Sequence, residues 1–134
     1  MAKILLVEDD DLVNDMLKQM LERAGHEIQT AANGEEAAQI LKTTEPDIMV
    51  TDIIMPKKSG ITLISEVKDQ HPNMEIIAIS GGGRLDPIGY LDLSESIGAS
   101  ISFEKPVDKS ALLMAIDLLL HGKAASSEVV SSGK

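Results

Sequence analysis

The sequence predicts one α/β domain built on a doubly wound, five-stranded parallel sheet with helices on both faces. Short apolar runs alternate five times with longer segments whose apolar residues recur every three or four positions. Each helix returns the chain to the same edge of the sheet, so successive strands run parallel. The length of 134 residues fits one domain with one core.

The composition excludes several classes of protein. Twenty-two Asp and Glu against twelve Lys and Arg give a net charge of −10, which argues against binding nucleic acid or anionic lipid directly. The absence of cysteine excludes disulfides, zinc knuckles and thiol nucleophiles. The apolar run at residues 4–7 is too short for a signal peptide or a membrane span. We therefore expect a cytoplasmic domain with no membrane partner.

The first half of the chain contains two strand–helix pairs. Residues 3–7 (KILLV) form a continuous apolar run, typical of a strand buried on both faces. Residues 11–24 have the spacing of an amphipathic helix, which Asp10 or Asp11 can cap and which ends at Gly25. Residues 27–31 alternate weakly, as in a short edge strand, and residues 34–42 follow as a second helix.

Three further pairs complete the pattern. Residues 47–50 predict a third strand running into Thr51 and Asp52, followed by a helix over 61–70. Residues 74–79 form a fourth strand that ends at Ser80, and Asp86 with Pro87 begins a helix that ends at Gly98. The fifth and weakest strand covers 100–103, and Asp108 caps the fifth helix.

The helical periodicity of the fifth helix ends near residue 121. From Gly122 the text GKAASSEVVSSGK has no apolar face. We expect a domain over residues 1–121 and a flexible tail or linker over 122–134.

Polar side chains follow the predicted strands at their carboxyl ends, where such sheets bind ligands. They are Glu8, Asp9, Asp10, Asp52, Ser80 and Lys105. Crowded carboxylates repel one another, and a hard divalent cation relieves that repulsion. A set of oxygen ligands without histidine or cysteine favours Mg²⁺, or Mn²⁺, over zinc. A lysine and a hydroxyl opposite the acids would suit phosphoryl oxygens, so we expect a carboxylate that attacks phosphorus and forms an acyl phosphate.

Four signatures resemble the receiver domain of two-component response regulators. They are ILLVEDD at 4–10, TDIIMP from 51 with Gly60, AIS at 78–80, and FEKP at 103–106, and the resemblance runs from about residue 3 to 121. It implies a flavodoxin-like fold with strand order 2-1-3-4-5, as in a chemotaxis receiver.

The resemblance also implies roles for the polar residues. Asp52 would be the phosphoacceptor. Lys105 would contact the phosphoryl oxygens, and Ser80 would donate to one of them. Asp9 would ligate Mg²⁺ directly, Glu8 mainly through water, and Ile54 through its backbone carbonyl. The Lys105–Pro106 bond is expected to be cis.

Partners follow from the same resemblance. The phosphoryl donor would be a histidine kinase or a histidine phosphotransfer protein, docking on the first helix, and the downstream protein is unknown. No helix-turn-helix or catalytic output domain follows the fifth helix. We therefore expect a stand-alone switch, catalysing only its own phosphoryl transfer and slow self-dephosphorylation. A receiver excised from a longer regulator is the alternative.

Several other residues have simpler interpretations. We expect Asp10 to be a cap or a solvated acid, and Pro56 and Gly60 to shape their loop. The glycines at 81–83 lack the GK[ST] that would accompany a phosphate-binding loop. The histidines at 26, 71 and 121 are expected to face solvent.

The sequence departs from the family pattern in two places. The aromatic residue usual three positions before the lysine is replaced by Ser102, and Phe103 follows it. A one-residue offset in a strand reverses the face, so we expect Phe103 to pack in the core. The segment GGGRLD at 81–86 is long and rich in glycine. We expect it to form the switch surface with the fourth helix, beside the fourth and fifth strands.

Two rival functions are weaker. An aspartyl-phosphate phosphohydrolase would need a second acid two residues after its nucleophile, and that position is Ile54. A receiver-like interaction module that works without phosphate would not need the complete set of acceptor residues.

Ile54 and Gly82 offer no polar side chain to orient a hydrolytic water, which is why we expect self-dephosphorylation to be slow.

Overall fold

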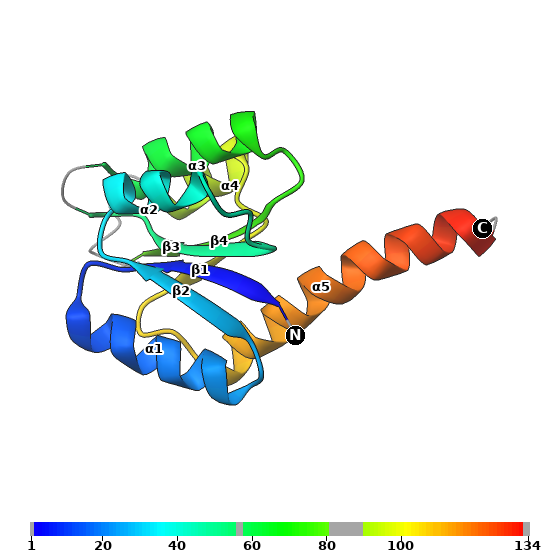
Figure 1. Ribbon diagram of the computed structural model, residues 1–134, viewed down its shortest axis with the longest axis horizontal. Helices are drawn as coiled ribbons and strands as arrows, with labels where there is room; N and C mark the ends of the chain where they lie inside the picture. Colours follow the sequence, from blue (N-terminus) through cyan, green and yellow to red (C-terminus); the bar gives the residue numbers. More distant parts are fainter. Residues whose placement is uncertain (1, 56–57, 81–89, 133–134) are drawn as a thin grey trace.

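The computed structural model of the chain describes residues 2–55, 58–80 and 90–132. Five strands form one parallel sheet in the order β2-β1-β3-β4-β5, as predicted (Figure 1). The strands are β1 (Lys3–Val7), β2 (Glu27–Ala31), β3 (Ile48–Asp52), β4 (Glu75–Ser80) and β5 (Ile101–Glu104).

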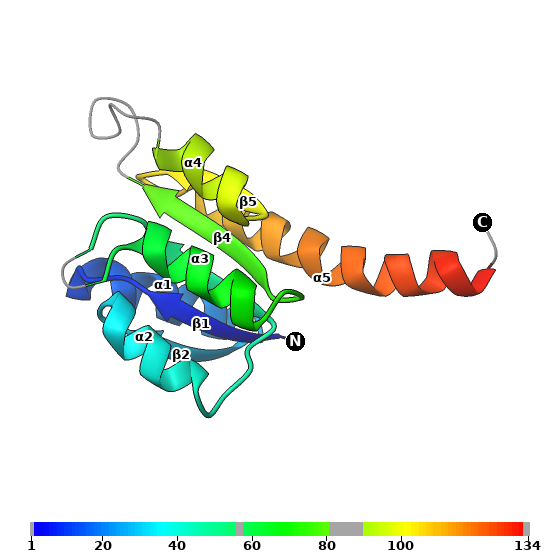
Figure 2. The ribbon, with the colours of Figure 1, turned by 90° about the horizontal axis from the view of Figure 1, so that it is seen from above.

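Helices cover both faces of this sheet. They are α1 (Asp11–Arg23), α2 (Gly34–Leu41), α3 (Gly60–Gln70), α4 (Tyr90–Ile97) and α5 (Lys109–Ser132). Figures 1 and 2 show α2, α3 and α4 on one face and α1 and α5 on the other. None of the helices in the described ranges is long and apolar enough to cross a lipid bilayer.

The alternation of side chains along β1 divides the core into two layers. Leu5 and Val7 pack with α2 and α3 on one face, whereas Ile4 and Leu6 pack with α1 and α5 on the other. All four side chains are buried, which explains why β1 is a continuous apolar run rather than an alternating one.

The register of the sheet aligns the carboxyl ends of its central strands. Val7 of β1 lies opposite Thr51 of β3, and Asp52 lies opposite Ile79 of β4. The residues that follow β1, β3 and β4 therefore meet at one edge, as the strand-end argument predicts.

Helix caps fix where α1 and α2 begin. The carboxylate of Asp10 accepts hydrogen bonds from the backbone N–H groups of Leu12 and Val13, so the predicted role of Asp10 as a cap is confirmed. The side chain of Asn33 caps α2 in the same way, a role that the sequence analysis did not assign.

Some boundaries differ from the prediction. The strands β3, β4 and β5 each start one residue later than predicted and end one or two residues later. The later end of β3 arises because Thr51 and Asp52 pair with β4 although the apolar run stops before them. Helix α4 begins at Tyr90, and the predicted start at Asp86 and Pro87 lies outside the described residues.

Helix α5 continues through Gly122 to Ser132, where the sequence analysis predicted a tail without helical structure. Helical hydrogen bonds are internal to the segment, so a helix needs no apolar face to keep its backbone paired. Lys123, Ala124 and Ala125 are good helix formers, and no proline interrupts them. A linker role for residues 122–134 stays a prediction.

The prediction that His26 faces solvent is wrong. Its side chain is buried, and Nδ1 accepts a hydrogen bond from the backbone N–H of Ala2 at 3.1 Å. Burial lowers the pKa of His26, the positive N-terminus lowers it further, and Asp117 opposes both. His71 is half-buried with Nδ1 3.5 Å from a Glu45 carboxylate oxygen, whereas His121 is exposed.

Candidate functional site

Glu8 and Asp9 leave β1 at the carboxyl edge of the sheet. The Glu8 side chain is only 1% exposed, whereas Asp9 is exposed. The Glu8 N–H donates to the Ala31 carbonyl at the end of β2, and its carboxylate accepts from the Asp10 N–H at 3.0 Å. The structure therefore buries one acid of the pair and presents the other to solvent.

Asp52 is the last residue of β3, and it is 5% exposed. The backbone around it is closely packed. A Cβ on Gly60 would lie 2.2 Å from the Asp52 carbonyl oxygen and 2.6 Å from the Ile53 Cα, and the Gly60 N–H donates to the Ile53 carbonyl at 2.7 Å. The prediction that Gly60 shapes the loop is confirmed, while Pro56 lies outside the described residues.

Lys105 follows β5, the edge strand of the sheet, and lies beside Glu8 and Asp52. Its backbone N–H donates to the Ser80 carbonyl at 2.6 Å, and the bond to Pro106 is cis, as predicted. The ammonium nitrogen Nζ lies 2.9 Å from Asp52 Oδ2 and 3.0 Å from Glu8 Oε1. Lys105 therefore pairs with both buried acids at once.

Burial and charge set the protonation of these groups. Burial is the largest influence on Glu8, and with the nearby Asp52 charge it raises the pKa to about 7, although the Asp10 N–H and Lys105 lower it. Burial alone would lower the pKa of Lys105. Its hydrogen bonds to Asp52 and Glu8 outweigh that effect, so the pKa of Lys105 is raised and the ammonium stays charged.

The three acids fit a divalent cation. One carboxylate oxygen from each of Glu8, Asp9 and Asp52 can be chosen so that all three lie within 4.8 Å of one another. This is the only such group of three or more among the described residues. Oxygen ligands suit Mg²⁺ or Mn²⁺, so these residues could hold a metal ion.

The remaining predicted residues lie beside this cluster. Ser80 ends β4 and is buried, and its carbonyl bond to Lys105 places it next to the lysine. The Ile54 side chain is 52% exposed. A hydroxyl donor role for Ser80 and a backbone ligand role for Ile54 stay predictions.

Ser102 and Phe103 lie on opposite faces of β5. Phe103 packs against the core layer formed with α1 and α5, which confirms its predicted position. The Ser102 hydroxyl donates to Glu95 of α4 at 2.5 Å. The residue at the usual aromatic position therefore contacts α4 through a hydrogen bond.

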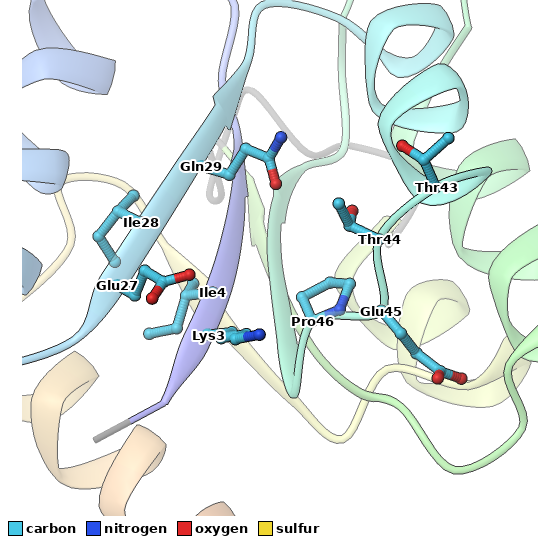
Figure 3. A pocket seen from close by; sticks show the side chains of 9 residues that line it. All are labelled: Lys3, Ile4, Glu27, Ile28, Gln29, Thr43, Thr44, Glu45 and Pro46. Atoms are coloured by element: carbon cyan, nitrogen blue, oxygen red, sulfur yellow. The ribbon is translucent and has the colours of Figure 1, made fainter.

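A depression of about 470 Å³ lies at the opposite, amino end of β1 and β2 (Figure 3). Figure 3 shows a lysine and two glutamates at its rim, Lys3, Glu27 and Glu45. All three are exposed and they carry charges of both signs, so the depression does not favour ligands of one charge over the other. This depression is far from the carboxyl strand ends and does not belong to the candidate site.

Sequence reasoning missed Asn14. Its side-chain amide donates to the Glu8 carbonyl at 3.0 Å and to the Ala31 carbonyl at 3.4 Å. An asparagine in the second turn of a helix has no distinctive pattern, and only the structure shows that it reaches the acidic segment.

Comparison with known proteins identifies the family. The family model for the response regulator receiver domain matches residues 4–117. The chain belongs to this family. Receiver domains are the regulatory modules of two-component systems, so the chain is a signalling module rather than a metabolic enzyme.

Curated relatives are transcriptional regulators. CpxR from Klebsiella pneumoniae subsp. pneumoniae (strain HS11286) is 33% identical over 121 residues, 90% of this chain. NtrC from Azospirillum brasilense is 31% identical over 120 residues, which also cover 90% of this chain. The aligned region is 50% of CpxR and 24% of NtrC, so this chain spans half or less of these relatives.

Solved receiver domains share the fold over almost their whole length. A receiver domain protein from Clostridium thermocellum has a TM-score of 0.84 at 32% identity, over 93% of this chain and 98% of that one. A CheY-like receiver from Methanospirillum hungatei JF-1 has a TM-score of 0.85 at 28% identity, over 94% and 98%.

Proposed function

We propose that this receiver domain accepts a phosphoryl group on Asp52 from a phosphohistidine, in the presence of Mg²⁺. The donor is a histidine kinase or a histidine phosphotransfer protein. The observation that supports this most strongly is the geometry around Asp52, whose carboxylate is 2.9 Å from Lys105 Nζ and belongs to the cluster of three acids.

The reaction is a substitution at phosphorus. An Asp52 carboxylate oxygen forms a bond to phosphorus, the P–N bond to the donor imidazole breaks, and the imidazole leaves with the electron pair of that bond. Lys105 stabilises negative charge on the phosphoryl oxygens, and Ser80 donates a hydrogen bond to one of them. Little rearrangement is needed because Lys105 already lies against Asp52.

Glu8, Asp9 and Asp52 hold the metal ion, with the Ile54 carbonyl as a further ligand. When bound, Mg²⁺ supplies positive charge next to the phosphoryl oxygens. Asp9 is suited to direct ligation because it is exposed, and the buried Glu8 to a supporting role.

The phosphorylated state binds a downstream protein through the surface of β4, α4 and β5. The Ser102–Glu95 bond joins β5 to α4 on this surface. The predicted switch loop lies outside the described residues.

Self-dephosphorylation is slow in this proposal. Ile54, two residues after Asp52, is exposed at the site and has no polar group to orient an attacking water. The lifetime of the phosphoprotein tests this, and a half-life of only seconds would contradict it.

Binding of beryllofluoride, a phosphoryl mimic, tests the proposal without a donor protein. Backbone amide signals of β3, β4 and β5 should shift saturably when beryllofluoride and Mg²⁺ are added together. The Asp52→Asn variant should show no such shift. A folded wild-type protein that does not respond would favour the receiver-like module that works without phosphate.

A further inference from the structure

Asn14 connects α1 to the segment that carries the acidic pair. Its Nδ2 lies 3.0 Å from the Glu8 carbonyl oxygen and 3.4 Å from the Ala31 carbonyl oxygen. A primary amide has two N–H groups, so Asn14 can donate to both oxygens at once. The side chain is half-buried between helix and sheet.

The two carbonyls lie where the pairing between β1 and β2 ends. Ala31 is the last residue of β2, and its carbonyl also accepts the N–H of Glu8 at 3.1 Å. The Glu8 carbonyl belongs to the peptide group that joins Glu8 to Asp9. Asn14 therefore holds the peptide between the two acids at the point where the β1–β2 ladder ends.

The backbone of Asn14 is itself fixed. Its N–H donates to the Asp10 carbonyl at 2.8 Å in the first turn of α1, and Asp10 caps that helix. Side chains in a helix tilt toward its N-terminus, which directs the amide toward the strand ends. Asn14 is therefore bonded to both ends of the loop between β1 and α1, to Glu8 through its side chain and to Asp10 through its backbone N–H.

We propose that Asn14 is a positioning residue for the metal site. It touches neither metal nor phosphoryl group. Instead, it fixes the Glu8–Asp9 peptide so that both carboxylates stay near Asp52. This inference rests on the proposed function, because it takes the three acids to hold Mg²⁺.

The need for such a tether follows from charge. One carboxylate oxygen from each of Glu8, Asp9 and Asp52 lies within 4.8 Å of the others, and these groups repel one another when they are ionised. Lys105 pairs with Glu8 and Asp52, and no bond to Asp9 is described for it. A loop freed from Asn14 would relieve the repulsion by moving Asp9 away, and Mg²⁺ would have to draw it back.

The experiment measures Mg²⁺ affinity by isothermal titration calorimetry in the whole chain. Asn14→Ala removes both donors, and we expect binding to weaken by about tenfold, the range for residues that orient metal ligands. Asn14→Ser keeps a hydroxyl donor on a shorter side chain and should give a smaller loss. Gln19→Ala is the control, because Gln19 is an exposed amide on the same helix that bonds only to Asp15 among the described contacts.

Urea unfolding of the same variants separates positioning from stability. A purely structural Asn14 would lower unfolding stability and leave Mg²⁺ affinity of the folded protein unchanged, which would overturn the inference. If Asn14→Ala does not fold, the same comparison on Asn14→Ser decides. A wild-type protein that binds no Mg²⁺ would instead refute the metal site of the proposed function, and this inference with it.

Discussion

Glu8 is the most buried ionisable group of the site, and its charge depends on its neighbours. Its pKa is raised to about 7, mainly by burial. Near neutral pH the carboxyl is therefore partly protonated, and a cation that binds the site must displace that proton. Protonation removes the negative charge that Glu8 contributes to the site, so proton binding and Mg²⁺ binding oppose each other.

Mg²⁺ affinity should accordingly rise with pH. Below pH 7 the wild-type protein must lose a proton from Glu8 when Mg²⁺ binds. Each unit by which the pH falls therefore weakens Mg²⁺ binding by up to about tenfold, and above pH 7 the affinity levels off. Calorimetric titrations between pH 6 and 8 measure this. Glu8→Gln should bind more weakly with a flatter pH profile, and Glu22→Gln on the exposed side of α1 should match wild type. A wild-type affinity independent of pH over this range would contradict the assignment.

His26 predicts a second pH effect, on stability. Its folded pKa is below the ordinary value of 6.5. The unfolded chain therefore takes up the proton first as pH falls, and stability is lost from about pH 6.5 downward. Relative to His26→Gln, which can still accept the Ala2 N–H, wild type should lose free energy of unfolding between pH 7.5 and 5. Urea unfolding at both pH values measures this. If the difference in free energy of unfolding between wild type and His26→Gln is the same at both pH values, His26 does not titrate as described.

Single residues differ in how well sequence predicts them. Glu8, Asp9, Asp52 and Lys105 end or follow strands, so the rule that ligands bind at carboxyl strand ends was enough to group them. His26 is buried and accepts a long-range hydrogen bond from the Ala2 N–H, and the local sequence contains no sign of either.

The junction between β3 and α3 shows how one element positions the site. The N-terminus of α3 approaches the Asp52 backbone so closely that only a hydrogen fits at Gly60. The start of α3 therefore fixes the backbone position of Asp52, the proposed phosphoacceptor.

Gly60→Ala should lower the free energy of unfolding by about 3 kcal/mol, because the new methyl would overlap backbone atoms that have no room to move. Asp52 should also shift, so beryllofluoride binding should weaken even where the protein stays folded. Ser65→Ala, on the exposed side of the same helix, should change neither quantity. Chemical denaturation checks stability, and a Gly60→Ala protein as stable as wild type would contradict the described packing.

Elements were predicted well where packing and periodicity agree. Helix α1 matched because its apolar spacing coincides with the face that packs on the sheet. Helix α5 was predicted too short because its last turns continue on backbone hydrogen bonding and helix propensity, without the apolar periodicity used to find it. Ser102 shows the same limit, since its partner Glu95 could not be inferred from a pattern.

The whole molecule brings distant segments of a strongly acidic chain together. Lys105 and Asp52 are 53 residues apart in sequence and meet because β3, β4 and β5 are parallel neighbours. The sheet order itself came from the family resemblance, since alternating strands and helices fix parallel direction but not which strands adjoin. In a chain with a net charge of −10, the half-buried Lys105 places a positive charge between two buried acids, Glu8 and Asp52.

Mass spectrometry after incubation with acetyl phosphate and Mg²⁺ shows directly whether Asp52 accepts a phosphoryl group. We expect a single phosphoryl adduct of about +80 Da on the wild-type chain and none on Asp52→Asn, because the acyl phosphate forms only on that carboxylate. A folded wild-type protein without the adduct, or an Asp52→Asn protein that still acquires it, would show that Asp52 is not the phosphoacceptor.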